Sequence, residues 1–347
     1  MNVACVLLAL MTLLPGSDDA SSLDTDTIVR RAVGYRAGIQ RGHVMFSVRY
    51  NRNTNAADYE QVIKNYDMYF DKKSVRSIVH WNHPAWARVT KTVVTDENFI
   101  SEWSKEDRVV TGPRSEGTMA IYVQEAFDPR LLGLVPVDVS LLYRSSIGHP
   151  FFFSENEHSK AIDVKLDGQD ALRIDYRIAP DRRVRLWIAP RIGYGVLRLE
   201  RENGTPGQPG HSLAVVSSKF EKSERGGIWF PKEVTRRQFS GDTLLTEEVI
   251  HVERVQLNTD VDPAFFSFKG LALEPGTKVM DVHHRMMIWT GSQLVDEHRS
   301  RDPSTDATNP SPRRTTTRWF WWSNGVICVV VFSILLHRSF RQAHKAQ

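Results

Sequence analysis

The long central part of this sequence contains no cysteine. The 2 cysteines of the chain, Cys5 and Cys328, lie in apolar segments close to the two ends. Disulfide bonds, cysteine nucleophiles and thiolate metal sites are therefore excluded from the region between them. Whatever chemistry this region performs must use other side chains.

The common motifs of catalysis and cofactor binding are also missing. The sequence has no Gly-x-Ser-x-Gly, no phosphate-binding loop, no dinucleotide-binding glycine pattern and no His-Glu-x-x-His. His283 and His284 follow Asp281 closely, but adjacent residues of a strand point to opposite faces and chelate one ion poorly. We predict a non-catalytic protein with no cofactor and no metal site. A hydrolase whose residues converge from distant strands is the less favoured alternative.

Charge of one sign is not in excess. There are 45 Lys and Arg against 41 Asp and Glu, a formal net charge of +4, and part of the basic excess follows Pro312. This balance argues against a nucleic-acid partner. The hydrophobic fraction of 41% and the charged fraction of 25% are those of a globular protein with a substantial core.

Long apolar runs are confined to the two ends. Val3 to Leu14 has the length of a secretory h-region, so we predict a signal peptide over 1–20, with an uncleaved anchor as the alternative. Trp319 to Leu336 carries no charge, opens with four aromatic residues and is long enough for a transmembrane helix. The expected arrangement is a body over 21–295 in the periplasm or exterior, a linker over 296–318, membrane attachment through 319–336 and a cytoplasmic tail over 337–347.

Apolar and charged residues alternate in the central third of the chain. Leu172 to Ile178, Val184 to Ile188 and Leu197 to Glu200 each place apolar side chains on one face of a strand. Such runs, joined by short turns, predict an antiparallel sheet with one side on a core. Further strands are expected over 44–50, 66–70, 75–81, 86–94, 118–124, 213–220, 228–239 and 243–257, with a final hairpin over 279–289.

Helical structure is expected to be scarce. Ile28, Ala32, Tyr35 and Ile39 recur at helical spacing within 24–41, and Asp24 is a suitable N-cap. Short helical pieces are expected over 127–134 and 139–147, and a polar loop over 104–117. The predicted class is mainly β, or α+β, with an N-terminal helix and short helical insertions.

Three stretches carry a resemblance to a known family. They are RLWIAPRIGYGVLRLE (185–200), GGIWFP (226–231) and LNTDVDPAFF (257–266). With the preceding helix and Asn258, this pattern resembles the periplasmic lipoprotein-carrier superfamily, the LolA/LolB-like outer-membrane lipoprotein-sorting proteins. The family turn Asp-Pro-x-Thr-Gly reads Ala189-Pro190-Arg191-Ile192-Gly193 here, so its Asp is absent. The resemblance covers about 24–266 and rests on turn chemistry and strand order.

The resemblance implies a curved, open antiparallel barrel around a helical plug, with a concave face that binds acyl chains. The partner it implies is a lipid or a lipoprotein acyl chain. The apolar lining expected on this basis is Val44, Phe46, Val48, Leu172, Ile174, Tyr176, Leu186, Ile188, Leu197 and Leu199. The alternative is that these residues only pack against the N-terminal helix. Because a carrier must leave the membrane and this chain has an anchor, a tethered sensor that binds an envelope protein is a second hypothesis.

Arginines are frequent on the polar face of the predicted strands. Arg182, Arg183 and Arg185, with Arg173 and Arg177, form a basic stripe on neighbouring strands. Cross-strand pairing with Asp175 and Glu200 is the favoured interpretation. Contact with an anionic headgroup is the alternative.

Overall fold

The computed structural model describes residues 24–52, 62–82, 87–103, 108–113, 126–134, 157–158, 160–224 and 226–297. The predicted signal peptide, transmembrane span and tail lie outside these residues, as do the strand expected over 118–124 and the helical piece over 139–147. Within the described residues, no helix is long and apolar enough to cross a membrane.

The described residues fold mainly into β-structure, with one α-helix, α2 (Thr25–Ala37). The first group of strands precedes the 3-10 helix η3 (Pro129–Leu131), and the second group follows it. The first group is β1 (Gly42–Arg52), β2 (Val62–Phe70), β3 (Val75–Asn82), β4 (Arg88–Val94), β5 (Asn98–Trp103) and β6 (Arg108–Pro113). The second is β7 (Glu157–His158), β8 (Ile162–Leu166), β9 (Gln169–Ala179), β10 (Arg182–Ala189), β11 (Gly195–Asn203), β12 (Ser212–Lys222), β13 (Trp229–Ser240) and β14 (Thr243–Leu257). Three 3-10 helices and three short strands complete the chain: η5 (Pro190–Ile192), η6 (Pro263–Phe266), η7 (Lys269–Leu271), β15 (Lys278–Asp281), β16 (Met286–Trp289) and β17 (Leu294–Asp296).

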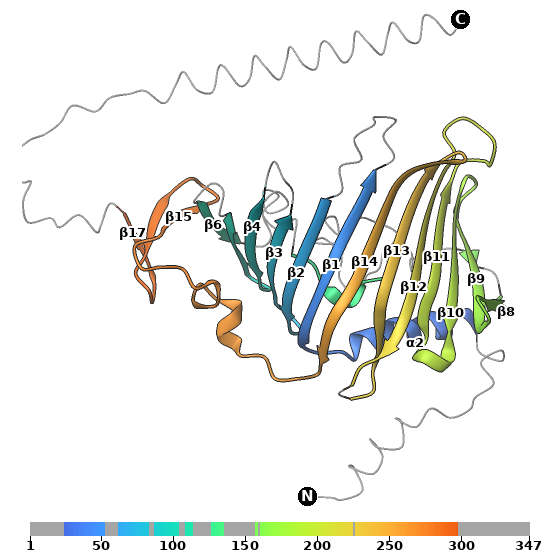
Figure 1. Cartoon of the computed structure of the whole chain (residues 1–347), viewed down its shortest axis with the longest axis horizontal. Helices are drawn as coiled ribbons and strands as arrows, with labels where there is room; N and C mark the ends of the chain where they lie inside the picture. The colour runs from blue at the N-terminus through green and yellow to red at the C-terminus, as the bar shows by residue number, and fades with distance from the viewer. Residues whose placement is uncertain are drawn as a thin grey trace, which may run out of the picture. The chain divides into compact units, whose positions relative to one another are not determined.

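All these strands belong to one curved sheet (Figure 1). The spatial order is β8-β9-β10-β11-β12-β13-β14-β1-β2-β3-β4-β5-β6-β15-β16-β17, and β7 also pairs with β9. The long pairing of β1 with β14 joins the two meanders. Among the described residues no ladder joins β8 to β17, so the curved sheet is open and does not close into a barrel.

Two local expectations were wrong. The segment 104–117 was expected to be a loop, yet Arg108 to Pro113 form β6. Val109 and Val110 pack into hydrophobic clusters on opposite faces of this strand, so its sequence lacks the alternation of a strand that is buried on one side. Furthermore, β6 pairs with β15 in parallel, whereas we expected an antiparallel sheet throughout.

The N-terminal helix forms where its pattern indicated, but it is shorter. Asp24 caps it by accepting a hydrogen bond of 2.8 Å from the backbone N–H of Thr27. The helix ends at Ala37, with Gly38 as its C-cap, rather than at residue 41. Ile39 is buried beyond the helix, and Gly42 already opens β1.

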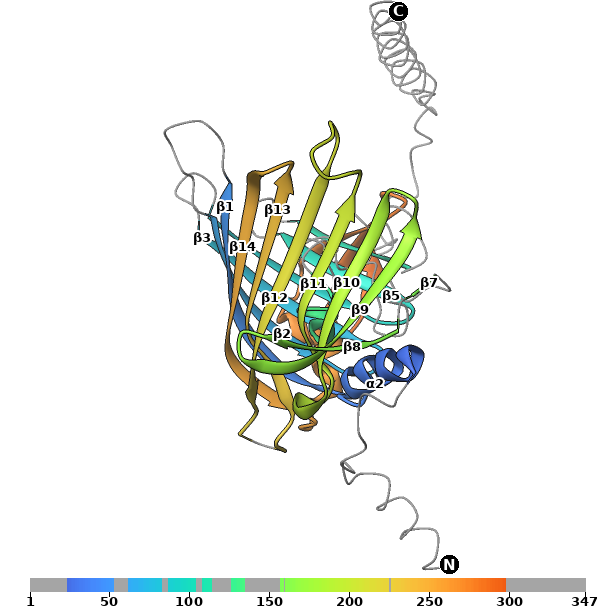
Figure 2. The same cartoon turned by 90° about the vertical axis from the view of Figure 1, so that its right-hand side faces the viewer.

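The core lies between α2, η3 and the concave side of the sheet. Its largest cluster combines Ile28, Val29 and Ala32 of α2 with buried residues of β1–β3 and β9–β14. Figure 2 shows α2 at the lower end of the sheet, beside β8 and β9. A second cluster joins the outer face of β4–β6 to the segment containing η7, β15 and β16. The outer face is thus covered at β4–β6, while the concave face carries the main core.

Candidate functional site

The residues expected to line a ligand site lie together on the concave face, with one exception. Nine of the ten are at most 4% exposed and belong to the main core cluster. They are Val44, Phe46 and Val48 of β1, Leu172, Ile174 and Tyr176 of β9, Leu186 and Ile188 of β10, and Leu199 of β11. We call these nine residues the apolar floor. Their contact with a lipid stays a prediction, because burial alone does not distinguish a ligand site from a core.

Leu197 does not belong to the floor. Ile188 pairs with Val196 while Trp187 pairs with Arg198, so Leu197 is the extra residue of a β-bulge. The bulge turns its side chain to the outer face, where it packs with Ala171 and Ala189. Strict alternation would have placed Leu197 and Leu199 on the same face, and this is why the sequence pattern misassigned Leu197.

The floor is covered by α2 and by the segment around η3. Phe46 stacks on Tyr66 with ring centroids 4.6 Å apart, and Phe127 meets Phe46 edge-on at 6.0 Å. Leu131, Leu132 and Leu134 complete this cover. The floor therefore packs against the helix in this structure, as the alternative interpretation required. A ligand on the floor has to displace part of this cover.

Besides its three buried apolar residues, the helix is attached through polar contacts at its C-terminal half. The Tyr35 hydroxyl accepts a hydrogen bond of 2.7 Å from the backbone N–H of Trp229. Arg36 is only 2% exposed and donates from Nη2 to the carbonyl oxygen of Leu132 at 2.9 Å, and its guanidinium lies 4.8 Å from the Phe230 ring centroid. Burial lowers the pKa of the Arg36 guanidinium to about 10. Arg36 forms no ion pair with a described residue, so burying it is costly.

The upper part of the concave face, away from α2, is polar. The register puts Arg236, Glu248 and Tyr50 in one row across β13, β14 and β1. Nη1 of Arg236 lies 3.4 Å from Oε2 of Glu248, whose side chain is 2% exposed. These residues occupy the same face as the floor, because each lies two positions from a floor or core residue.

A second polar row lies next to the first. Lys64, Trp81 and Arg88 align across β2, β3 and β4. The Lys64 ammonium lies 3.7 Å from the Trp81 ring centroid, and the Arg88 guanidinium carbon lies 4.1 Å from the same centroid. Lys64 is buried, and Trp81 and Arg88 are half-buried. The concave face thus combines an apolar half with a charged half, which suits an amphipathic ligand better than a plain hydrocarbon.

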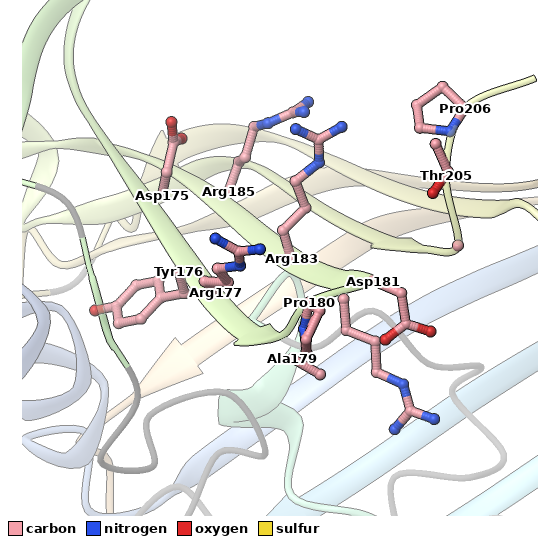
Figure 3. Close-up of a pocket in the computed structure, with 12 residues that line it drawn as sticks. Asp175, Tyr176, Arg177, Ala179, Pro180, Asp181, Arg183, Arg185, Thr205 and Pro206 are labelled. Carbon is pink, nitrogen blue, oxygen red and sulfur yellow. The ribbon is translucent and has the colours of Figure 1, made fainter.

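The outer face of β9 and β10 carries a separate cleft of about 630 Å³ (Figure 3). Arg177, Arg183 and Arg185 line it together with Asp175 and with the loop at 204–206. The predicted pairing of the basic stripe is present at Arg185, whose Nη1 donates to Glu200 at 2.7 Å. Glu202, which the sequence pattern did not single out, accepts from both Arg183 and Arg185.

No family model matches the sequence, and no curated protein matches it. Solved structures do match it in fold. One is a domain from Vibrio parahaemolyticus assigned to outer membrane lipoprotein sorting, at 10% identity and a TM-score of 0.44, covering 72% of this chain and 98% of that chain. Another is a LolA superfamily protein from Nitrosomonas europaea, at 13% identity and a TM-score of 0.43, covering 72% of this chain and 100% of that one. A DUF1329 family protein from Desulfovibrio piger matches at 15% identity and a TM-score of 0.44, covering 71% and 96%.

These matches include proteins of the lipoprotein-sorting family that the sequence resembles. The resemblance is weak in sequence identity and in TM-score. At such TM-scores it carries no argument about ligand or partner. Any proposal about a ligand therefore depends on the geometry of the concave face and of the outer cleft.

The charged half of the concave face was missed at the level of sequence. The signal that would have found it is the two-residue period of a strand. Lys64 precedes Tyr66 by two residues, Arg236 follows Val234 by two, and Glu248 precedes Ile250 by two. Alternation was applied to the apolar members of these series, and it applies equally to their charged neighbours on the same face.

Proposed function

We propose that this chain is a non-catalytic, extracytoplasmic protein that binds the acyl part of a lipid or lipoprotein on its concave face. The observation that carries the proposal is the apolar floor, whose residues on β1 and on β9–β11 form one hydrophobic cluster with the buried residues of the intervening strands β12–β14, under a small cover. Three apolar residues of α2 contribute to that cover, namely Ile28, Val29 and Ala32. An acyl chain that replaces them recovers about 25 cal/mol for each Å² of apolar surface it buries.

The polar attachment of α2 supports displacement of this cover. Arg36 is buried without an ion pair to a described residue, and its Nη1 has no hydrogen-bond partner among them. Moving α2 away from the sheet returns this guanidinium to water, which offsets part of the cost of opening.

The charged half of the concave face supports an amphipathic ligand. An acyl chain along the floor leaves its polar end close to the rows of Arg236 and Lys64. Buried charges are expensive unless they are paired, so their clustering beside an apolar surface is typical of a functional site.

Mass spectrometry under native conditions tests the proposal. The full chain is extracted in a mild detergent and exchanged into an uncharged amphipol, and the bound lipids are identified. Hydrogen exchange is then measured with and without added lipid. Lipid on the floor should speed exchange in α2 while leaving β1 and β14 protected. If no lipid accompanies the protein and added lipid leaves α2 unchanged, the proposal is wrong.

Membrane attachment through 319–336 is part of the proposal and is tested separately. The full chain should stay with the membrane fraction in alkaline carbonate, and a chain that ends at residue 310 should be released. Protease added outside the cell should cleave the body while sparing the tail. A body protected from external protease, in cells whose outer barrier is opened, would contradict the proposed location.

A further inference from the structure

Two arginines face each other across neighbouring strands in the outer cleft. Arg183 of β10 is the register partner of Arg177 of β9. Their neighbours Tyr176 and Val184 belong to the core cluster, so alternation places both guanidinium groups on the outer face. Like charges directly opposite each other destabilise an antiparallel pair. The fold keeps this arrangement although an acidic residue at either position would remove the cost.

The carboxylates of β11 on this face are already engaged by other groups, and the register partner of Arg177 on its other side is Glu157 of β7. Glu202 already accepts from Arg183 and Arg185 through Oε2 and contacts His211 through Oε1. Glu200 is shared between Arg185 and Arg198. Arg177 forms no ion pair with any residue whose side chain the structure describes.

The charge of this patch is positive even when its acids are counted. On the outer face of β9, β10 and β11, five arginines stand with three carboxylates. The arginines are Arg173, Arg177, Arg183, Arg185 and Arg198, and the carboxylates are Asp175, Glu200 and Glu202. When Arg182 and Asp181 of the cleft lining and Glu157, the register partner of Arg177 on β7, are added, six arginines stand against five carboxylates, an excess of one positive charge. Asp181 also lines the cleft, at the β9–β10 turn.

The cleft has built walls. The backbone N–H of Gly204 donates to the carbonyl oxygen of Asp181 at 2.7 Å, which holds the loop at 204–206 against the β9–β10 turn. Glu202 accepts hydrogen bonds from both Arg183 and Arg185 and so restrains their orientation. Figure 3 shows the side chains of these two arginines next to each other. Guanidinium groups held in this way bind phosphate oxygens in pairs, at little further cost in side-chain entropy.

We propose that this cleft binds a phosphate group, which bridges Arg177 and Arg183 and relieves their repulsion. The phosphate belongs either to a lipid headgroup or to a soluble phosphate compound. Most of the site lies on the face of the sheet opposite the apolar floor, and Tyr176 is the one floor residue that also lines the cleft.

Thermal unfolding of the full chain in an uncharged detergent tests the site, with inorganic phosphate as the probe and chloride at equal ionic strength as its control. Arg177→Gln is the main variant. Arg191→Gln is the matched control, because Arg191 is 85% exposed in η5, at the opposite end of β10. Without phosphate, Arg177→Gln should unfold at the same temperature as the parent or higher, since the repulsion is gone. With phosphate, the parent and Arg191→Gln should gain stability, and Arg177→Gln should bind about tenfold more weakly.

The source of the phosphate is distinguished by flotation with vesicles. Vesicles of phosphatidylcholine alone are compared with vesicles that also contain phosphatidylglycerol, and the same three proteins are used. If the parent binds the anionic vesicles and Arg177→Gln does not, the phosphate in the cleft belongs to a lipid headgroup. A response to inorganic phosphate without such vesicle binding assigns it to a soluble compound. Equal responses of Arg177→Gln and the parent in both experiments, or no response of either, would overturn the proposal.

Discussion

The hydroxyl of Tyr35 on α2 accepts a hydrogen bond from the backbone N–H of Trp229, at the first residue of β13. This contact spans 194 positions of sequence and ties the covering helix to the sheet. Gly193 packs directly against the same tyrosine ring, so the ring is held between the η5 turn and β13. The attachment of α2 thus depends on a few contacts that can be changed one at a time.

Tyr35→Phe is predicted to loosen this attachment. It leaves the Trp229 N–H without its acceptor, which should lower the free energy of unfolding by about 1 kcal/mol in urea denaturation. Hydrogen exchange in α2 should become faster. The matched control is Tyr194→Phe, which removes an exposed hydroxyl that accepts from Arg31 at 2.7 Å. It should change stability by less than about 0.5 kcal/mol, and equal losses in the two variants would contradict the assigned role of Tyr35.

Gly193→Ala should destabilise the protein through backbone strain and through a clash with the Tyr35 ring. A substitution at Gly207 measures the first effect by itself. Gly193 has φ of 68°, and an added Cβ would overlap the Tyr35 ring. Gly207 has φ of 79° but nothing within 4 Å of such a Cβ. Gly207→Ala therefore measures backbone strain alone, about 1 kcal/mol. Gly193→Ala should cost at least about 1 kcal/mol more, because the ring must move. If Gly193→Ala and Gly207→Ala have similar midpoints in thermal unfolding, the Tyr35 ring moves aside for the added methyl group at no cost, and the predicted clash is wrong.

Leu199→Val and Leu197→Val form a matched pair that tests the apolar floor. Both remove one methylene from a buried side chain of β11, so each should cost about 1 kcal/mol of stability. Leu199 faces the concave side and Leu197 the outer side. Only Leu199→Val should therefore change the affinity for a fluorescent fatty acid. An equal change in both affinities would mean that binding depends on stability alone and not on the floor.

Glu202→Gln should reduce stability in a way that depends on pH. Burial raises the pKa of Glu202, but the hydrogen bonds from Arg183 and His211 outweigh it and hold the pKa below its ordinary value. A carboxyl with a lowered pKa in the folded state stabilises it above the ordinary pKa of 4.5 and loses this contribution as the pH falls further. The gap between parent and variant in urea denaturation should be widest near pH 7 and shrink below about pH 4.5. A gap that stays constant down to pH 3 would contradict the ionic role of Glu202.

Local patterns were sufficient to predict most of the secondary structure. Alternation identified β9 and β10, and the strands expected over 66–70, 75–81 and 243–257 are present as β2, β3 and β14. The spacing of Ile28 and Ala32 identified α2 and its buried stripe. These features depend on side-chain direction within one element, which the order of residues specifies directly.

Contacts between distant segments were not predictable in this way. The bulge that turns Leu197 outward, the parallel pairing of β15 with β6 and the opposition of Arg177 to Arg183 all depend on strand register. Register is set when faces from many strands are buried together, so it is a property of the assembled sheet. The residue order specifies which face of each strand is apolar. Which apolar face meets α2, and which charges meet one another, is decided by the packing of segments that lie far apart in the chain.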